Sequence, residues 1–356
     1  MPRFALLLVL ALLVAAGATV GAAVHWPDIS RQPAEWYADP EARAIADTIL
    51  LYQTPSGGWQ KNTDMTRPPA PKLPGPHEEP SDVNGATLDN DATTTQLLYL
   101  ARVITATGDA RLRPAFEHGF DYLLAAQYDS GGWPQFFPLR PGYYSRITYN
   151  DNAMVNTLTV LRDAVRGRSP YAFVDAGRRH QAAAAVEKGI ACILRTQVRQ
   201  DCKPTVWCAQ HDETTFAPAW ARNYEPPSLS GNESVGIVRF LMGIEHPSLE
   251  VVAAIEGAVA WFRSTAISGL RFDTAPGADG KKDRHAVADP AAPALWARFY
   301  ELGTNRPIYI GRDRVIRYSY NEIERERRTG YAYLGTWPAK LLEKDYPLWR
   351  EKHPAP

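Results

Sequence analysis

The chain of 356 residues has 39 Lys and Arg and 39 Asp and Glu, so its formal net charge is zero. It has no overall positive field that would hold a nucleic acid backbone, and we expect no nucleic acid partner. Hydrophobic residues make up 45% and charged residues 22%, which excludes global disorder and supplies a sizeable core.

Residues 1–23 have the composition of a secretory signal peptide. One Arg precedes an apolar run that begins at Ala5, and the segment ends in small residues that suit a signal peptidase. Cleavage near Ala23 predicts an exported protein, secreted or periplasmic, without stable membrane association. It would leave one domain over residues 24–356. The alternative is an uncleaved membrane anchor, because the apolar run is long enough to span a bilayer.

Three tryptophans mark an internal repeat. Trp59, Trp133 and Trp207 are separated by 74 residues and again by 74. Each follows a segment with helical spacing of apolar residues that ends in Gln and a short loop. These glutamines are Gln53, Gln127 and Gln197. Such a period fits two long helices with their loops, so we predict a mainly α protein folded as an incomplete α/α toroid. The alternative is an irregular helical bundle with chance Trp spacing.

Other segments fit this architecture. Helical spacing continues over 96–107, 153–165 and 235–244. Six prolines between Pro68 and Pro80 exclude a helix interior or central strand, so we expect a loop within the domain and not a domain linker. Residues 306–337 combine short β-prone runs with one charged helix over 321–328, and we expect them to close the toroid.

The cysteines give little structural information. Cys192, Cys202 and Cys208 cannot all pair within one chain, although Cys202 and Cys208 could close a small loop in an oxidising compartment. The sequence contains no CxxC, HExxH or EF-hand motif, so it gives no support for a zinc site.

Short polar residues gather just ahead of two predicted helices. The two clusters are Asp89, Asn90 and Asp91, and Asn150, Asp151 and Asn152. One interpretation is that Asp91, and Asp151 or Asn150, cap the helices that follow. A cap needs only one side chain, however, and Asp and Asn oxygens are the hard ligands that Ca²⁺ prefers. The pattern therefore predicts a calcium site shared between two helix starts.

Several basic residues occur next to aromatic or polar segments. They are Lys61, Arg146, Arg222, Arg306, Arg312 and Arg314. Singly, each is typical of a surface or ion-paired residue. Together with nearby Trp and Tyr they suit a groove for an anionic sugar polymer, where guanidinium groups bind carboxylates and aromatic rings stack on sugars. Arg222 is the most unusual, because it lies beside Glu225 in a Pro- and Ser-rich loop.

A set of motifs occurs in order between Trp26 and Tyr346: GGWQKN, TLDNDATTTQL, SGGWPQFFPL, YNDNAM, WCAQHDE, YEPPSLSGNESVGI, NRPIY and ERRTGYAYLGTWP. Together they resemble the family 10 polysaccharide lyases, which are pectate lyases. The resemblance implies an incomplete (α/α)3 toroid with a few short antiparallel β segments. It also implies a secreted enzyme that cleaves α-1,4-linked polygalacturonate by calcium-assisted β-elimination, giving 4,5-unsaturated oligogalacturonides.

The resemblance implies roles for individual residues. Asp89 and Asp151 would hold calcium and the substrate carboxylate, with Asn90 beside them, and Arg222 would be the base. Arg312 would clamp a substrate carboxylate, with Arg306 as its rival. Lys61 and Arg146 complete the expected substrate-binding set. The family usually has Arg-Asp-Gly where this chain has Arg312, Asp313 and Arg314.

The expected base sets the expected pH dependence. Arginine is a poor base near neutrality, so activity should favour alkaline conditions. Adjacent cations, among them Ca²⁺, Lys61 and Arg312, would lower the pKa of Arg222.

Two other functions fit the same residues. A glycoside hydrolase on an α/α toroid could use Asp89 and Asp151 as its acid and base. A non-catalytic protein could bind polyuronate without cleaving it. For the lyase we expect a monomer that binds polygalacturonate.

Overall fold

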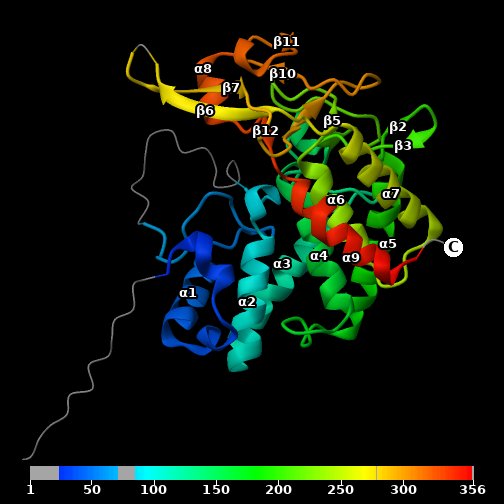
Figure 1. Ribbon diagram of the computed structural model, residues 1–356. Helices are drawn as coiled ribbons and strands as arrows, with labels where there is room; N and C mark the ends of the chain where they lie inside the picture. Colours follow the sequence, from blue (N-terminus) through cyan, green and yellow to red (C-terminus); the bar gives the residue numbers. More distant parts are fainter. Residues whose placement is uncertain (1–23, 71–84, 278, 355–356) are drawn as a thin grey trace, which may run out of the picture.

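The computed structural model describes residues 24–70, 85–277 and 279–354 (Figure 1). The predicted signal peptide and most of the proline-rich segment lie outside these residues, and those two predictions remain untested. Within the described ranges, no helix is both long and apolar enough to cross a membrane.

Six helices form two rows, and a further helix, α1, packs beside them. Along one row, α2, α4 and α6 contact one another in succession, and along the other α3, α5 and α7 do the same (Figure 1). Helix α1 packs against α2, α4 packs against α5, and α6 packs against α7. Their bounds are α1 (Pro40–Leu51), α2 (Thr94–Thr107), α3 (Arg113–Ala125), α4 (Ala153–Val165), α5 (Ala176–Thr196), α6 (Glu233–Met242) and α7 (Leu249–Ser264). Because the chain alternates between the rows, the helices form an incomplete α/α toroid, as predicted.

Hydrogen bonds of Trp and Gln side chains explain the repeat of 74 residues. The indole Nε1 of Trp133 donates to the carbonyl of Leu123 at 2.8 Å, near the end of α3. Gln127 Nε2 donates to the carbonyl of Ala185 at 2.8 Å, which ties the end of α3 to α5. The same pair of bonds recurs in the first and third copies, through Trp59 with Gln53 and through Trp207 with Gln197. Each copy is thereby fixed to the next.

The glycines of the repeat allow the loops to approach the next helix closely. Gly57 and Gly131 have φ values of +101° and +92°. A Cβ on Gly131 would lie 2.2 Å from the carbonyl oxygen of Lys188 in α5. In the third copy, which lacks GGW, the close approach involves the helix glycine, because a Cβ on Gly257 of α7 would lie 2.6 Å from the carbonyl oxygen of Pro204.

A fourth copy was not predicted from the sequence. Trp296 Nε1 donates to the carbonyl of Phe262 at 2.8 Å, near the end of α7. The hairpin of β6 (Leu270–Pro276) and β7 (Lys282–Ala288) is inserted between them. This insertion lengthens the spacing between Trp207 and Trp296, so the fourth copy does not follow the interval of 74 residues.

The strands of the described residues form two-stranded antiparallel pairs: β1 with β4, β2 with β3, β5 with β9, β6 with β7, β8 with β12, and β10 with β11. The remaining bounds are β1 (Ile147–Thr148), β2 (Arg199–Gln200), β3 (Lys203–Pro204), β4 (Gln210–His211), β5 (Leu229–Ser230), β8 (Trp296–Ala297), β9 (Phe299–Tyr300), β10 (Tyr309–Ile310), β11 (Ile316–Arg317) and β12 (Leu334–Gly335).

The predicted C-terminal mixture of strands and a charged helix is present. The charged helix is shorter than expected, α8 (Arg325–Gly330), and follows a 3₁₀ turn at Tyr320–Glu322. With β6, β7 and β10 to β12 it lies over one end of the helical rows (Figure 1). The last helix is α9 (Tyr346–Lys352).

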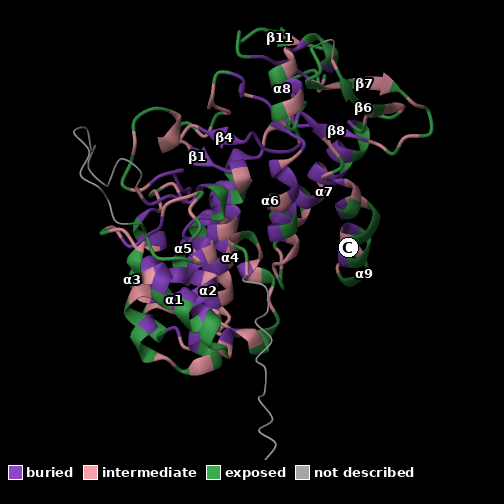
Figure 2. Ribbon diagram, turned by 90° about the vertical axis from the view of Figure 1, so that its left-hand side faces the viewer, coloured by how far each residue is buried: buried purple, intermediate pink, exposed green. Residues whose placement is uncertain are grey.

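One contiguous core joins the copies. Buried residues concentrate on α2, α4 and α6 and on β1 and β4 (Figure 2). Trp59, Trp133 and Trp207 are among its largest fully buried side chains. Truncating such a side chain to Ala costs about 3 to 5 kcal/mol. Cys192, Cys202 and Cys208 are free thiols, so the small disulfide loop considered from the sequence is absent.

Candidate active site

The two polar clusters form short 3₁₀ turns, Asp89–Asp91 and Asn150–Asn152, that pack against each other ahead of α2 and α4. Asn90 and Asp151 both have a φ of +50°, in the left-handed region. Such backbone costs of order 1 to 3 kcal/mol per residue and clusters at functional sites. The two helix starts therefore hold a strained arrangement in place.

The capping interpretation is wrong. The N-cap of α2 is Thr93 and the N-cap of α4 is Asn152, and neither side chain bonds the first turn of its helix. The Asp91 carboxylate instead accepts a hydrogen bond from Asn156 Nδ2 at 2.6 Å. The polar side chains ahead of these helices thus need another explanation.

Asp89 is buried, with 3% of its surface exposed. Its Oδ2 accepts a hydrogen bond from Lys61 Nζ, and the two residues form an ion pair. Its Oδ1 is buried and has no hydrogen-bond partner among the described residues. A buried carboxylate oxygen without a partner is costly, and a cation would satisfy it.

Asp151 lies across from Asp89 on the second turn. Its Oδ2 accepts a hydrogen bond from Asn150 Nδ2 at 2.8 Å, and its Oδ1 lies 3.8 Å from Arg298 Nη2. Burial raises the pKa of Asp151, and the Arg298 guanidinium opposes this effect. The negative charge of Asp89 raises the pKa of Asp151 further. A divalent cation between the two carboxylates would relieve this repulsion.

A small polar cavity of about 80 Å³ joins these side chains. Five of the eight residues predicted for the site line it: Lys61, Asp89, Asn90, Asp151 and Arg222. Its other lining residues are Gln135, Tyr143, Asn150, Gln210 and Glu225. The structure therefore brings the predicted metal ligands and the predicted base to one place.

Arg222 is held by Glu225 within the same loop. Arg222 Nε donates to Glu225 Oε2 at 2.7 Å, and Arg222 Nη2 donates to Oε1. Burial opposes the charged form of Arg222, but the hydrogen bonds and charge of Glu225 outweigh it and raise its pKa. We expected neighbouring cations to lower this pKa. The carboxylate contact has the opposite effect in the protein without bound ligand.

Three predicted substrate-binding residues do not line the cavity. Arg146 pairs with Asp212 and Glu213, and the guanidinium of Arg306 stacks 3.6 Å from the ring centroid of Tyr318. Arg312 forms a bidentate pair with Glu326, through Nε and Nη2 at 3.0 Å each. Arg312 is nevertheless near the Arg222 loop, because its guanidinium lies 5.9 Å from the ring centroid of Tyr224. Arg312 and Arg306 are the two candidates for binding a substrate carboxylate, and of these Arg312 contacts the Arg222 loop.

Arg314 occupies the position where the family pattern has Gly. Its φ of +65° is in the left-handed region, which favours Gly. Its Nη2 donates to Asn223 Oδ1 at 2.7 Å, so it bonds the residue that follows Arg222. This side-chain bond helps to hold an unfavourable backbone.

Several residues of the site were not predicted from the sequence. Gln135 and Gln210 each follow a repeat tryptophan closely, a recurrence that could have identified them. Buried Arg298 pairs with Glu233 and donates to Asn150 Oδ1 at 3.3 Å. No local pattern singles out Arg298, because its partners lie far away in the sequence.

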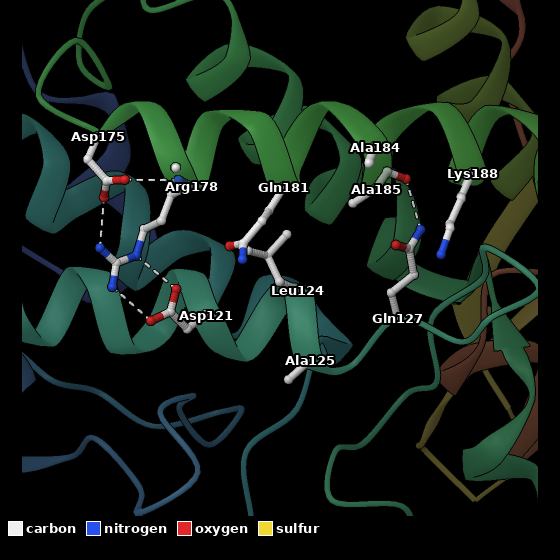
Figure 3. A pocket seen from close by; sticks show the side chains of 11 residues that line it. Asp121, Leu124, Ala125, Gln127, Asp175, Arg178, Gln181, Ala184, Ala185 and Lys188 are labelled. Carbon is white, nitrogen blue, oxygen red and sulfur yellow. Dashed lines mark hydrogen bonds and ion pairs between the residues drawn. The ribbon is translucent and has the colours of Figure 1, made fainter.

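A larger open cavity of about 770 Å³ lies between α3 and α5 (Figure 3). It is lined by none of the predicted site residues. Arg178 at its edge is already paired with Asp121 and Asp175, through hydrogen bonds of 2.8 Å. This cavity thus offers no unpaired arginine for a sugar carboxylate.

Comparisons with known proteins identify the family. A family model described as pectic acid lyase matches residues 53–342. The family 10 polysaccharide lyase from Cellvibrio cellulosa is 34% identical, with a TM-score of 0.74 over 90% of this chain and 96% of that chain. A mutant of that lyase in complex with trigalaturonic acid gives the same identity and coverage with a TM-score of 0.75. No curated protein matches the chain.

The family model and the two solved structures favour the lyase over the hydrolase and binding-only alternatives. The chain belongs to the pectic acid lyase family, and it is a pectate lyase.

Proposed function

We propose that this lyase cleaves polygalacturonate by calcium-assisted β-elimination in the cavity between the two helix starts. The observation that carries the proposal is the buried, unpartnered Oδ1 of Asp89 beside the carboxylate of Asp151. The trigalaturonic acid in the complex of the similar lyase supports a galacturonate polymer as the substrate.

Asp89 and Asp151, with Asn90 beside them, would hold the calcium ion. These are hard oxygen donors of the kind Ca²⁺ prefers. The described part of the chain contains no group of three or more His, Cys, Asp or Glu that could hold a metal. Amide oxygens and the substrate carboxylate would therefore have to complete the coordination. When bound, Ca²⁺ would neutralise the uronate carboxylate and stabilise the enolate-like charge that develops during elimination.

Arg222 would remove the proton from C5 of the uronate. The C5–H electrons then form the C4–C5 double bond, the C4–O4 bond breaks, and the leaving oxygen takes a proton from solvent water. Because Glu225 favours the charged guanidinium, the neutral base should form only at alkaline pH. Arg312, at the margin of the Arg222 loop, would bind a neighbouring substrate carboxylate.

The proposal includes export and a monomeric state. Residues 1–23 would direct the chain to the periplasm or outside the cell, with cleavage near Ala23. N-terminal sequencing of the mature protein tests this. Recovery of an intact N-terminus on membrane-embedded protein would favour an anchor.

The decisive experiment measures polygalacturonate turnover with and without a chelator. We expect ultraviolet absorbance from the unsaturated uronide, its loss with chelator and its return when Ca²⁺ is added in excess. New reducing ends without this absorbance would indicate hydrolysis. Unchanged turnover in chelator would contradict the calcium requirement.

A further inference from the structure

The contact between Arg222 and Glu225 uses two particular nitrogens of the guanidinium. Nε and Nη2 both donate to the carboxylate, and the backbone N of Arg222 donates to Oε2 at 3.1 Å. Glu225 is buried, with 4% of its surface exposed, whereas 41% of the Arg222 side chain is exposed. The carboxylate is therefore the fixed partner, and it leaves Nη1 outside the bidentate contact.

Tyr331 fixes the carboxylate from a second element. Its hydroxyl donates to Glu225 Oε1 at 2.7 Å from the segment that follows α8. The same ring lies 4.9 Å from the guanidinium carbon of Arg298, which is near Asp151. Glu225 is thus held between the loop of the base and the segment packed beside the predicted metal site.

This geometry restricts which neutral form Arg222 can adopt. A neutral guanidine keeps its lone pair on the nitrogen that lost the proton. Loss of the Nε proton, or of the Nη2 proton that points at Glu225, would place that lone pair against a carboxylate oxygen, which is repulsive. Loss of a proton on the outward side, from Nη1 or from the second N–H of Nη2, preserves both hydrogen bonds to Glu225.

We propose that Glu225, fixed by Tyr331, is a positioning residue that excludes the Nε tautomer of the Arg222 base and keeps the lone pair of the neutral base on the outward side, at Nη1 or Nη2. The role is comparable to that of the carboxylate that fixes the histidine tautomer in serine hydrolases. The inference rests on the proposed function, in which Arg222 accepts the C5 proton. Glu225 contributes orientation, and it also makes the base harder to deprotonate.

The charged and titratable groups around Arg222 come from several elements. They are Tyr224 and Glu225 on its own loop, Tyr331 after α8, Tyr143 on the 3₁₀ turn Tyr143–Ser145, and Asp151 ahead of α4. The bidentate hydrogen bonds of Glu225 contribute most to the raised pKa of Arg222, against the opposing effect of burial. Removing the Glu225 charge should therefore lower that pKa.

The test compares Glu225→Gln and Tyr331→Phe with the wild type, over a pH series at saturating Ca²⁺. Glu225→Gln should lower kcat by about 100-fold with little change in KM, because the base is no longer oriented. The rise of kcat with pH should also occur at lower pH in Glu225→Gln than in the wild type, because the pKa of Arg222 is lower. Tyr331→Phe keeps the ring and loses only the hydroxyl, and it should lower kcat several-fold with KM unchanged.

Asp121→Asn is the matched control. Asp121 makes a bidentate contact with Arg178 in the remote cavity between α3 and α5 (Figure 3), so its loss should leave kcat unchanged. A wild-type kcat and pH profile in Glu225→Gln would overturn the proposal, as would an equal loss in Asp121→Asn. If Glu225→Gln does not fold, Tyr331→Phe decides: a several-fold loss of kcat supports the proposal, and a wild-type kcat overturns it. Absence of unsaturated product from the wild type would instead be a failure of the proposed function.

Discussion

Replacing Arg222 with Ala should remove most of the product formation and also weaken the fold. The side chain of Arg222 supplies two hydrogen bonds to Glu225 and forms an ion pair with it. Removing one partner of a fully buried pair costs about 3 to 5 kcal/mol. Because 41% of the Arg222 side chain is exposed, solvent screens this pair. We therefore expect a smaller loss of about 2 kcal/mol in the free energy of unfolding.

The pH dependence of stability shows whether the unpaired carboxylate of Glu225 causes this loss in Arg222→Ala. In the wild type, burial raises the pKa of Glu225, but Arg222 outweighs it and the net pKa lies below the ordinary value of 4.5. This pairing stabilises the fold above pH 4.5 and is lost as pH falls. Without Arg222, burial should raise the pKa of Glu225 above 4.5. The variant should then lose stability, relative to the wild type, as pH rises above about 4.5.

Denaturant unfolding at several pH values and single-turnover kinetics separate stability from chemistry. Arg222→Ala should lose about 10²- to 10⁴-fold in kcat while it still binds trigalacturonate. The double variant Arg222→Ala with Glu225→Gln should regain stability and remain inactive, because it removes the buried charge but restores no base. Arg222→Lys should rescue little, since an ammonium does not reproduce the planar guanidinium. A wild-type kcat in Arg222→Ala with weaker substrate binding would refute the base role and make Arg222 a carboxylate clamp.

Three other predictions follow from the same structure. Asp151→Asn should weaken Ca²⁺ binding, measured by calorimetry, at least about tenfold while changing the free energy of unfolding little, because 38% of the Asp151 side chain is exposed; unchanged affinity would exclude Asp151 as a ligand. Gln127→Ala should cost about 2 kcal/mol in denaturant unfolding without changing KM, because it removes two partly buried hydrogen bonds; exposed Gln181 is the matched control, and equal losses would contradict the repeat mechanism. The free energy of unfolding of Arg314→Gly should be about 1 kcal/mol higher than that of Arg314→Ala in denaturant unfolding. Both variants lose the bond to Asn223, and only Gly relieves the left-handed backbone.

The sequence was sufficient to predict the helical repeat because its signals are local. Helix α4 covers 153–165, as the apolar spacing predicted, and the Trp and Gln hydrogen bonds recur at the predicted interval. The meeting of Asp89 and Asp151 could also be predicted, since α2 and α4 are neighbours in one row and each is preceded by a polar turn.

Other parts of the site depend on contacts that leave no local signal. The pairing of Arg222 with Glu225 depends on the conformation of a loop with no regular period. Arg298 reaches Asn150 from 148 residues away in the sequence. The position of Arg146 could not be predicted either, because its acidic partners Asp212 and Glu213 lie on a turn after β4. Aromatic and charge composition suggested a groove, but only the fold determines which arginines are already paired.

The charges of the cavity lead to a last prediction, about binding without calcium. Three carboxylates line it, from Asp89, Asp151 and Glu225, against the two cations Lys61 and Arg222. An anionic sugar would thus meet a surplus of negative charge, which a divalent cation would reverse. Chelation should therefore weaken trigalacturonate binding itself, and not only kcat. Calorimetry on the inactive Arg222→Lys variant, which keeps the charge, measures this without turnover. Equal affinity with and without chelator would show that other residues bind the substrate carboxylate, and that calcium is needed only for the chemical step.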